Sequence, residues 1–153
     1  GWKFLSFGTV LDRGPIDLFR SINGSYDMIM WYDGRWKSYS PTRADRFNQE
    51  PPFQRDDAFW IHFTGPVNVT MNGFSCARTE HVLDEGWNMI GICSGAPFNT
   101  SGSGLSFSKI GQFNSTKEYM LEYTENDTMM VGGNGYMIES DAVGQTWIQV
   151  WRD

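Results

Sequence analysis

The two cysteines, Cys76 and Cys93, carry the most specific chemistry in this sequence of 153 residues. They lie seventeen positions apart, and two cysteines at this spacing are typical of one disulfide in an oxidising compartment. The bond would close a loop of about seventeen residues and stabilise the fold by about 3 kcal/mol in the chain-entropy model. The alternative is a pair of buried thiols in a cytosolic protein.

Asparagine offers a second chemistry, the attachment of N-linked sugar. Nine asparagines and 23 serines and threonines would produce about one or two Asn-x-Ser/Thr triplets by chance, yet the chain has five. A glycan is bulky and solvated, so we expect these asparagines to lie at the surface. Together with the cysteines, this excess predicts an extracellular glycoprotein. The five predicted acceptors are Asn23, Asn68, Asn99, Asn114 and Asn126.

No motif in the sequence indicates catalysis. His62 lies in an apolar segment and His81 in a connector, and no nucleophile-elbow, His-Glu-x-x-His or Cys-x-x-Cys pattern occurs. The glycine-rich segment 132–135 precedes a strand pattern and predicts a turn. Paired carboxylates could hydrolyse glycosides only if a cleft held them several ångströms apart. The carboxylates at 125–127 offer oxygen ligands for calcium, but a solvated turn is the favoured interpretation of that segment. We therefore expect a non-enzymatic protein without cofactor or metal. The carboxylate pairs are Asp56 and Asp57, Asp84 and Glu85, and Glu125 and Asp127.

The overall charge and hydropathy exclude two classes of partner. The formal net charge is −6, whereas a nucleic-acid-binding domain needs a clustered basic face. The chain contains no run of 18 apolar residues, so we expect no direct membrane insertion. Because Gly1-Trp2-Lys3 begins directly on a strand-like segment, we expect a mature protein or a piece cut from a longer one.

These groups must be positioned by β-structure. Aromatic residues make up 16% of the chain and 17 glycines supply turns, so the composition predicts an all-β fold, a β-sandwich or a barrel-like form, with one or two short helices. In the first half, period-two alternation and turn signals predict the following order: a strand within 1–10, a short helix at 16–22, a hairpin at 26–39 around Asp33-Gly34, a long surface loop at 42–57, and strands at 58–64 and 67–71.

The second half repeats this order at a period of about 85 residues. Gly86-Trp87-Asn88-Met89-Ile90-Gly91 resembles Gly1 to Ser6, and 135–140 resembles 58–63. Segment 105–110 is expected to correspond to the short helix, 118–123 to the strand at 27–32, and 146–150 to 67–71. We therefore expect two pseudo-repeated halves, 1–75 and 76–153, packed as one compact unit and linked by the disulfide.

The repeat resembles the GWN…GYW-type tandem β repeat of archaeal and bacterial surface and secreted proteins. The resemblance is carried by Gly86-Trp87-Asn88-Met89-Ile90, by 31–39 and by Gly135-Tyr136-Met137-Ile138. It implies small β modules on envelope or appendage proteins, without a catalytic assignment. Lys3 replaces the asparagine of the motif and Ala58 replaces a glycine, so the first copy matches less well.

The aromatic residues fall into two groups. Those at repeat-equivalent or strand-core positions are expected in the core; they are Trp2, Trp60, Trp87, Tyr136 and Trp147. A second group flanks the Asp33-Gly34 hairpin, where flat rings beside polar groups suit sugar stacking or a protein partner, and packing against the 42–57 loop is the alternative. This candidate binding group is Trp31, Tyr32, Trp36 and Tyr39.

Together these patterns predict a non-enzymatic extracellular glycoprotein module of a surface structure, located on a cell envelope, an appendage or a virion surface. Its expected partners are neighbouring protein subunits of that assembly, with glycans as further candidates. The alternatives are a carbohydrate- or receptor-binding adhesin module and an accessory domain of a secreted hydrolase.

Overall fold

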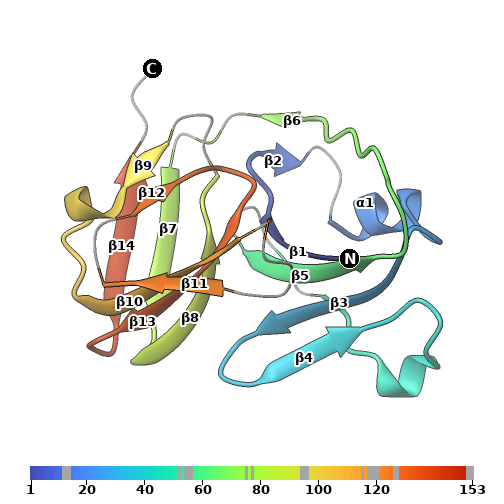
Figure 1. The fold of residues 1–153 in the computed structure, drawn as a ribbon, viewed down its shortest axis with the longest axis horizontal. Coiled ribbons are helices and arrows are strands. Elements are labelled where there is room, and N and C mark those ends of the chain that lie inside the picture. Colours follow the sequence, from blue (N-terminus) through green and yellow to red (C-terminus); the bar gives the residue numbers. More distant parts are fainter. Residues whose placement is uncertain are drawn as a thin grey trace.

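Two four-stranded antiparallel sheets form the frame of the protein, one in each half of the chain (Figure 1). The computed structural model describes residues 1–11, 15–51, 53, 57–74, 76, 78–93, 97–114, 116, 121–125 and 128–150. The first sheet has the order β1 (Trp2–Ser6), β5 (Ala58–Phe63), β3 (Tyr26–Tyr32) and β4 (Trp36–Tyr39). The second has the order β8 (Gly86–Gly91), β13 (Gly135–Ser140), β10 (Phe107–Phe113) and β11 (Leu121–Thr124).

Shorter elements complete each half. In the first half these are α1 (Pro15–Ser21), the 3-10 helix η1 (Asp45–Phe47), and the pair β2 (Val10–Leu11) and β6 (Gly73–Phe74). In the second half, β7 (Arg78–Leu83) pairs with β14 (Gln145–Val150), and β9 (Phe98–Asn99) pairs with β12 (Met129–Met130), while η2 spans Thr100–Gly102. The fold is therefore all-β with short helices, as the composition predicts.

The two large sheets share their register as well as their strand order. Each central pairing has one irregularity, and it falls between Tyr26 and Met28 in the first sheet and between Phe107 and Lys109 in the second. A β-bulge bends a strand and changes the direction of the side chains near it. Because the bulge falls at the same place in both sheets, the two sheets have the same local geometry there. The register makes the following residues equivalent: Trp2 and Trp87, Leu5 and Ile90, Phe59 and Tyr136, His62 and Glu139, Ile29 and Ile110, and Asp27 and Ser108.

The contact between the halves is reciprocal. Leu5 bridges to Asn134, and the equivalent Ile90 bridges to Asp57, which is the equivalent of Asn134 in the shared register. Contacts exchanged in this way are the signature of a two-fold, isologous interface. Ser6 adds two hydrogen bonds across the same junction, from its amide to the Gly133 carbonyl (2.9 Å) and from its hydroxyl to the Asn134 carbonyl (2.7 Å).

Each sheet buries one face against its own covering elements. The first core includes Phe7, Phe19, Ile29, Phe59 and Ile61, with α1 supplying Phe19. The second core includes Ile92, Ile110, Tyr136, Ile138 and Trp147, with β14 supplying Trp147. A third, smaller cluster of Phe4, Ala58 and Met137 lies between the two sheets. Fully burying an aliphatic or aromatic side chain contributes about 1.5–3 kcal/mol. Because the third cluster takes buried residues from both halves, it helps to hold them together.

The structure corrects several sequence-based assignments. Segment 105–110 is not the counterpart of the helix; Phe107–Phe113 forms strand β10, the equivalent of β3, because its alternating side chains pair with β13. The element in the chain position of α1 is instead the short η2. The strand expected at 118–123 is β11, which begins at Leu121 and corresponds to the edge strand β4; residues 117–120 lie outside the described part.

Two further differences concern the covering layers. Residues 67–71 form no strand, although Val67 and Val69 pack against the first core while Asn68 is exposed. The alternation at 67–71 is therefore a burial pattern without strand pairing. β14 pairs instead with β7, which lies in a segment predicted as a connector. The 42–57 segment is more than the surface loop that was predicted, because its Phe53 is buried in the first core.

Candidate binding face

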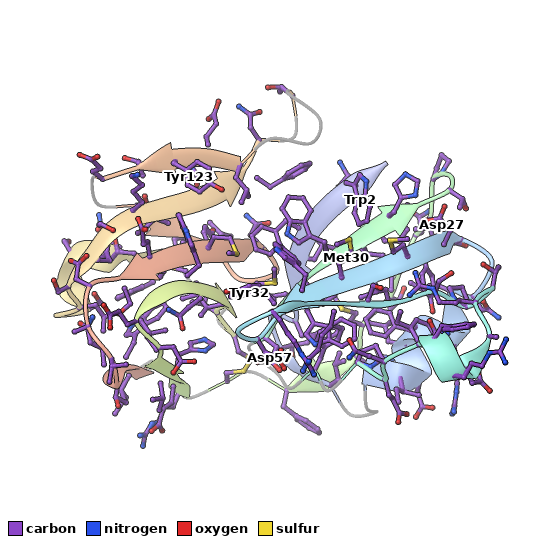
Figure 2. All side chains as sticks on the ribbon, turned by 90° about the horizontal axis from the view of Figure 1, so that it is seen from below. Trp2, Asp27, Met30, Tyr32, Asp57 and Tyr123 are labelled. Atoms are coloured by element: carbon purple, nitrogen blue, oxygen red, sulfur yellow. A yellow bond between two sulfur atoms is a disulfide. The ribbon has the colours of Figure 1, made fainter. Side chains whose placement is uncertain are left out.

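The outer face of the first sheet, opposite its core, gathers aromatic side chains from all four strands. Successive side chains of a strand alternate between faces, so Trp2, Trp60 and Met30 share this face with Tyr32 and Trp36. Figure 2 shows Trp2, Met30 and Asp27 on the same side of the sheet. A shallow concavity of about 220 Å³ lies among Trp2, Met30, Trp36 and Trp60, and we call it the tryptophan hollow.

The rings of the hollow are held by packing. Trp60 stacks on Phe4 with ring centroids 4.5 Å apart and an interplanar angle of 1°, and Phe113 of the second half meets it edge-on at 5.6 Å. Trp2 lies edge-on to Trp60 at 6.4 Å. Offset and edge-on aromatic pairs contribute about 0.5–1.5 kcal/mol each beyond area burial. The indoles are therefore presented in a preorganised arrangement.

Trp36 forms the outer wall. Its side chain is 53% exposed, and it contacts Tyr32 edge-on with centroids 5.5 Å apart. The hairpin that carries it turns at Asp33-Gly34, where Gly34 has a φ of 77° that favours glycine. Lys37 forms an ion pair with Asp33 across this turn.

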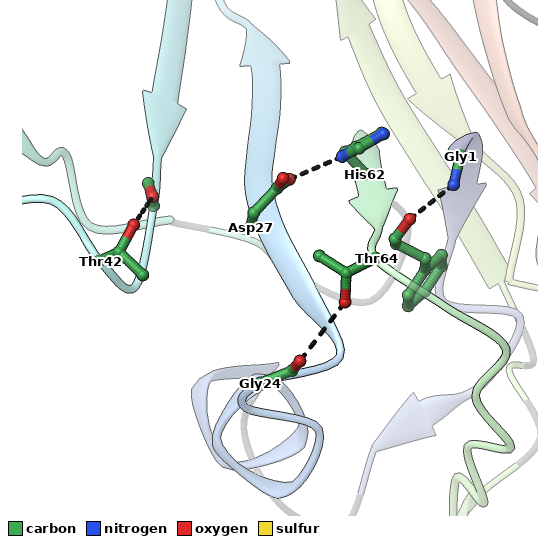
Figure 3. A network of polar contacts seen from close by, with 8 residues as sticks. Gly1, Gly24, Asp27, Thr42, His62 and Thr64 are labelled. Atoms are coloured by element: carbon green, nitrogen blue, oxygen red, sulfur yellow. Dashed lines mark hydrogen bonds and ion pairs between the residues drawn. The ribbon is translucent and has the colours of Figure 1, made fainter.

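A polar pair stands beside the hollow. Asp27 Oδ1 and His62 Nδ1 are 2.7 Å apart (Figure 3). The centroid of the His62 ring lies 5.1 Å from that of Trp2. Asp27 reaches His62 from the bulged position of β3. In the second sheet the equivalent positions also hydrogen bond, because the Ser108 hydroxyl donates to Glu139 Oε2 at 2.8 Å. This cross-strand contact is thus a feature of both copies, with a carboxylate and an imidazole only in the first.

The structure separates the four aromatic residues predicted as a binding group. Tyr32 and Trp36 lie on the outer face, as that prediction requires. Trp31 is wrong as a binding residue: it is only 3% exposed and packs edge-on against Phe53 at 5.4 Å. Tyr39 also faces the first core. The physical reason is strand alternation, which sends Trp31 and Tyr39 to the opposite face from their neighbours.

Of the aromatic residues predicted as core, Tyr136 and Trp147 are buried, whereas Trp2, Trp60 and Trp87 are only half-buried. Sequence reasoning therefore missed Trp2 and Trp60 as surface residues. A signal was present: in β5 the positions of Trp60 and His62 alternate with the apolar Phe59 and Ile61, and the polar imidazole marks the more accessible face.

The equivalent face of the second sheet is closed by its own side chain. Gly111 occupies the position of Met30, and Tyr123 occupies that of Ser38. A Cβ on Gly111 would lie 2.7 Å from Tyr123 Cε1, so the tyrosine ring covers the glycine directly. The same ring contacts Trp87 at a centroid distance of 5.4 Å. Among the described residues, the place that Tyr123 fills in the second sheet is therefore open in the first.

The predicted disulfide is present between Cys76 and Cys93, with their Cα atoms 5.6 Å apart. Cys76 follows β6 and Cys93 follows β8, so the bond links the junction of the two halves to the start of the second sheet. Both cysteines are buried. Such a bond stabilises the folded chain mainly by limiting its unfolded conformations.

None of the described glycosylation candidates is part of a strand of the first sheet. Asn23, Asn68 and Asn99 are exposed, and Asn99 accepts a hydrogen bond from the Ser101 amide at 3.0 Å. Asn114 is half-buried and donates to Glu122 Oε1 at 2.7 Å. Asn126 lies outside the described residues.

The remaining titratable groups are dispersed. Asp84 and Glu85 are exposed, and Asp57 takes part in the bridge to Ile90, while Asp56 and Asp127 lie outside the described residues. His81 Nε2 is 2.8 Å from the Gly91 carbonyl oxygen. Within the described residues, no group of three or more His, Cys, Asp or Glu side chains is placed to hold a metal ion. None of the helices described here is long and apolar enough to cross a bilayer.

Comparisons with protein-family models, with curated proteins and with solved structures each found no match to this chain, so its resemblance to the GWN…GYW-type repeat stays a prediction from the sequence.

Proposed function

We propose that this chain is a non-enzymatic glycoprotein module of an extracellular surface structure, displayed on a cell envelope, an appendage or a virion. The observation that carries the proposal is the buried Cys76–Cys93 disulfide at the junction of the halves. Disulfides persist in oxidising compartments and are rare in the cytosol. A module in which this bond holds the segment at the junction of the halves to the second sheet suits such an oxidising compartment.

The exposed sequons support the same location. Asn23, Asn68 and Asn99 present their side chains to solvent, where an attached sugar meets no steric obstacle. The strands of the first sheet carry no sequon asparagine. Glycans at these positions leave the outer face of that sheet available for contact with neighbouring subunits or other partners.

The proposal is tested on protein isolated from the organism that encodes it. Non-reducing peptide mass spectrometry is expected to recover the Cys76–Cys93 cross-link, and glycopeptide mapping is expected to find sugar on at least two of Asn23, Asn68 and Asn99. Surface labelling of intact cells or particles with a membrane-impermeant reagent is expected to modify the chain. Free thiols together with unmodified asparagines would overturn the proposal.

A further inference from the structure

We propose that the tryptophan hollow binds a neutral sugar ring of a glycan. This inference goes beyond the proposed function and does not depend on it. The hollow is lined by Trp2, Met30, Trp36 and Trp60, and its volume of about 220 Å³ suits a single ring, because pockets for drug-sized ligands are larger, roughly 300–1,000 Å³.

The chemistry of the lining favours a sugar. The C–H-rich face of a pyranose packs on flat aromatic rings, which carry a negative π-face. The indoles of Trp2 and Trp60 are fixed by neighbouring rings, so little side-chain freedom is lost when a ligand stacks on them. Trp36, which is largely exposed, supplies the opposite wall.

The polar pair beside Trp2 supplies the complementary contacts. Asp27 offers carboxylate oxygens that accept hydrogen bonds from sugar hydroxyls, and His62 retains its Nε2 atom after its contact through Nδ1. The ring of His62 lies 5.1 Å from Trp2, so both groups stand within reach of a sugar stacked on that indole. A carboxylate at this place repels acidic sugars, and we therefore assign a neutral hexose unit.

A peptide is less well matched to this surface. The hollow lies on the face of the sheet, which presents side chains, whereas a peptide that adds as a strand pairs with main-chain groups at a sheet edge such as β1 or β4. The second sheet shows how the equivalent place is closed when no ligand is needed: Tyr123 covers Gly111 and contacts Trp87. The first sheet has Ser38 and Met30 at these positions and leaves the hollow open.

The test begins with a panel of neutral, acidic and amino-sugar oligosaccharides immobilised on an array, probed with the purified chain. Hits are then titrated by tryptophan fluorescence and by ¹H–¹⁵N NMR. We expect binding to neutral hexose-containing glycans, with shifts confined to the four lining residues and to Asp27 and His62. Binding to acidic glycans or to aromatic peptides alone would overturn the assignment.

Two variants locate the site. Trp36→Ala removes the exposed wall and is expected to weaken binding roughly two- to twelvefold, the range that the loss of one aromatic contact gives. Phe74→Ala is the control, because it deletes an exposed ring from β6, which is not part of either large sheet. It is expected to leave the affinity unchanged. The site would be refuted if the Trp36→Ala variant bound the glycan as tightly as the native chain, or if the Trp36→Ala variant and the control variant lost the same affinity.

A third variant tests the hollow without deleting a tryptophan. The double substitution Met30→Gly and Ser38→Tyr reproduces the Gly111 and Tyr123 arrangement of the second sheet. It is expected to abolish glycan binding while the circular dichroism spectrum stays close to that of the native chain, with a melting temperature lowered only by the modest cost of a glycine inside a strand. A folded double variant that binds as well as the native chain would refute the proposal.

Discussion

A methyl group at Gly135 tests the contact between the two halves. A Cβ atom built at this position would lie 2.5 Å from Phe4 Cδ2 and 2.6 Å from Phe4 Cε2. The Phe4 ring has little room to move away, because it is only 2% exposed and stacks on Trp60 at 4.5 Å. Inserting a methyl group into a packed core of this kind costs about 1–3 kcal/mol.

The expected result of Gly135→Ala is therefore a loss of about 1–3 kcal/mol in the free energy of unfolding, measured by urea titration. The melting temperature should fall by roughly 2–12 °C, because 1 kcal/mol corresponds to about 2–4 °C in a chain of this size. Gly65→Ala is the control, since a Cβ there would meet no atom within 4 Å. A Gly135→Ala variant as stable as the Gly65→Ala variant would refute the reasoning.

The repeat supplies a compensating change. In the shared register, Ala58 is the equivalent of Gly135 and Met89 is the equivalent of Phe4, so the other side of the interface already holds a methyl group. Combining Phe4→Met with Gly135→Ala copies that arrangement. We expect the double variant to be more stable than the sum of the single effects by about 1 kcal/mol, within the range of coupling between touching residues. Strict additivity would contradict the proposed origin of the clash.

Three further predictions concern other parts of the molecule. Replacing both Cys76 and Cys93 with serine should lower the free energy of unfolding by about 3 kcal/mol, measured by denaturant titration, and a variant as stable as the native chain would contradict this. Burial, with a smaller contribution from Tyr39, raises the pKa of Tyr26 to about 12. The neutral phenol therefore stabilises the native state fully below pH 10, and this contribution is lost as the pH rises from about 10 to 12. Tyr26→Phe should reduce the loss of stability at alkaline pH, and an unchanged dependence of stability on pH would refute this prediction. Ile29→Ala and Ile110→Ala remove equivalent, fully buried side chains, so each should cost about 2–5 kcal/mol in thermal or urea unfolding, and a negligible cost at either site would exclude it from the core.

The sequence by itself determined the features that depend on neighbouring residues. Apolar and aromatic runs predict the strands at 58–64, 86–91 and 135–140, and the structure has β5 at Ala58–Phe63, β8 at Gly86–Gly91 and β13 at Gly135–Ser140. Asp33-Gly34 predicts the hairpin turn, because its backbone conformation is set locally. The spacing of the two cysteines predicts their bond, since a short connecting segment keeps them near each other.

The tertiary structure alone decided which face of each strand is covered. Alternation places Trp60 and His62 together, yet only the packing of α1 and Phe53 against the other face leaves the Trp60 face outward. The strand β7 was missed because its sequence, Arg78–Leu83, is polar, and it is specified by pairing with β14, more than 60 residues away.

The difference between the two sheets also depends on distant residues. In the first sheet Met30 and Ser38 leave the hollow open, whereas Gly111 and Tyr123 fill the equivalent place in the second sheet. The residues of each pair are brought together by the pairing of two strands. Equivalent strand positions therefore have different surroundings in the two copies. Local sequence sets the backbone conformation of a segment, whereas exposure is set by whichever distant segment packs on it, and that partner is chosen by the whole fold.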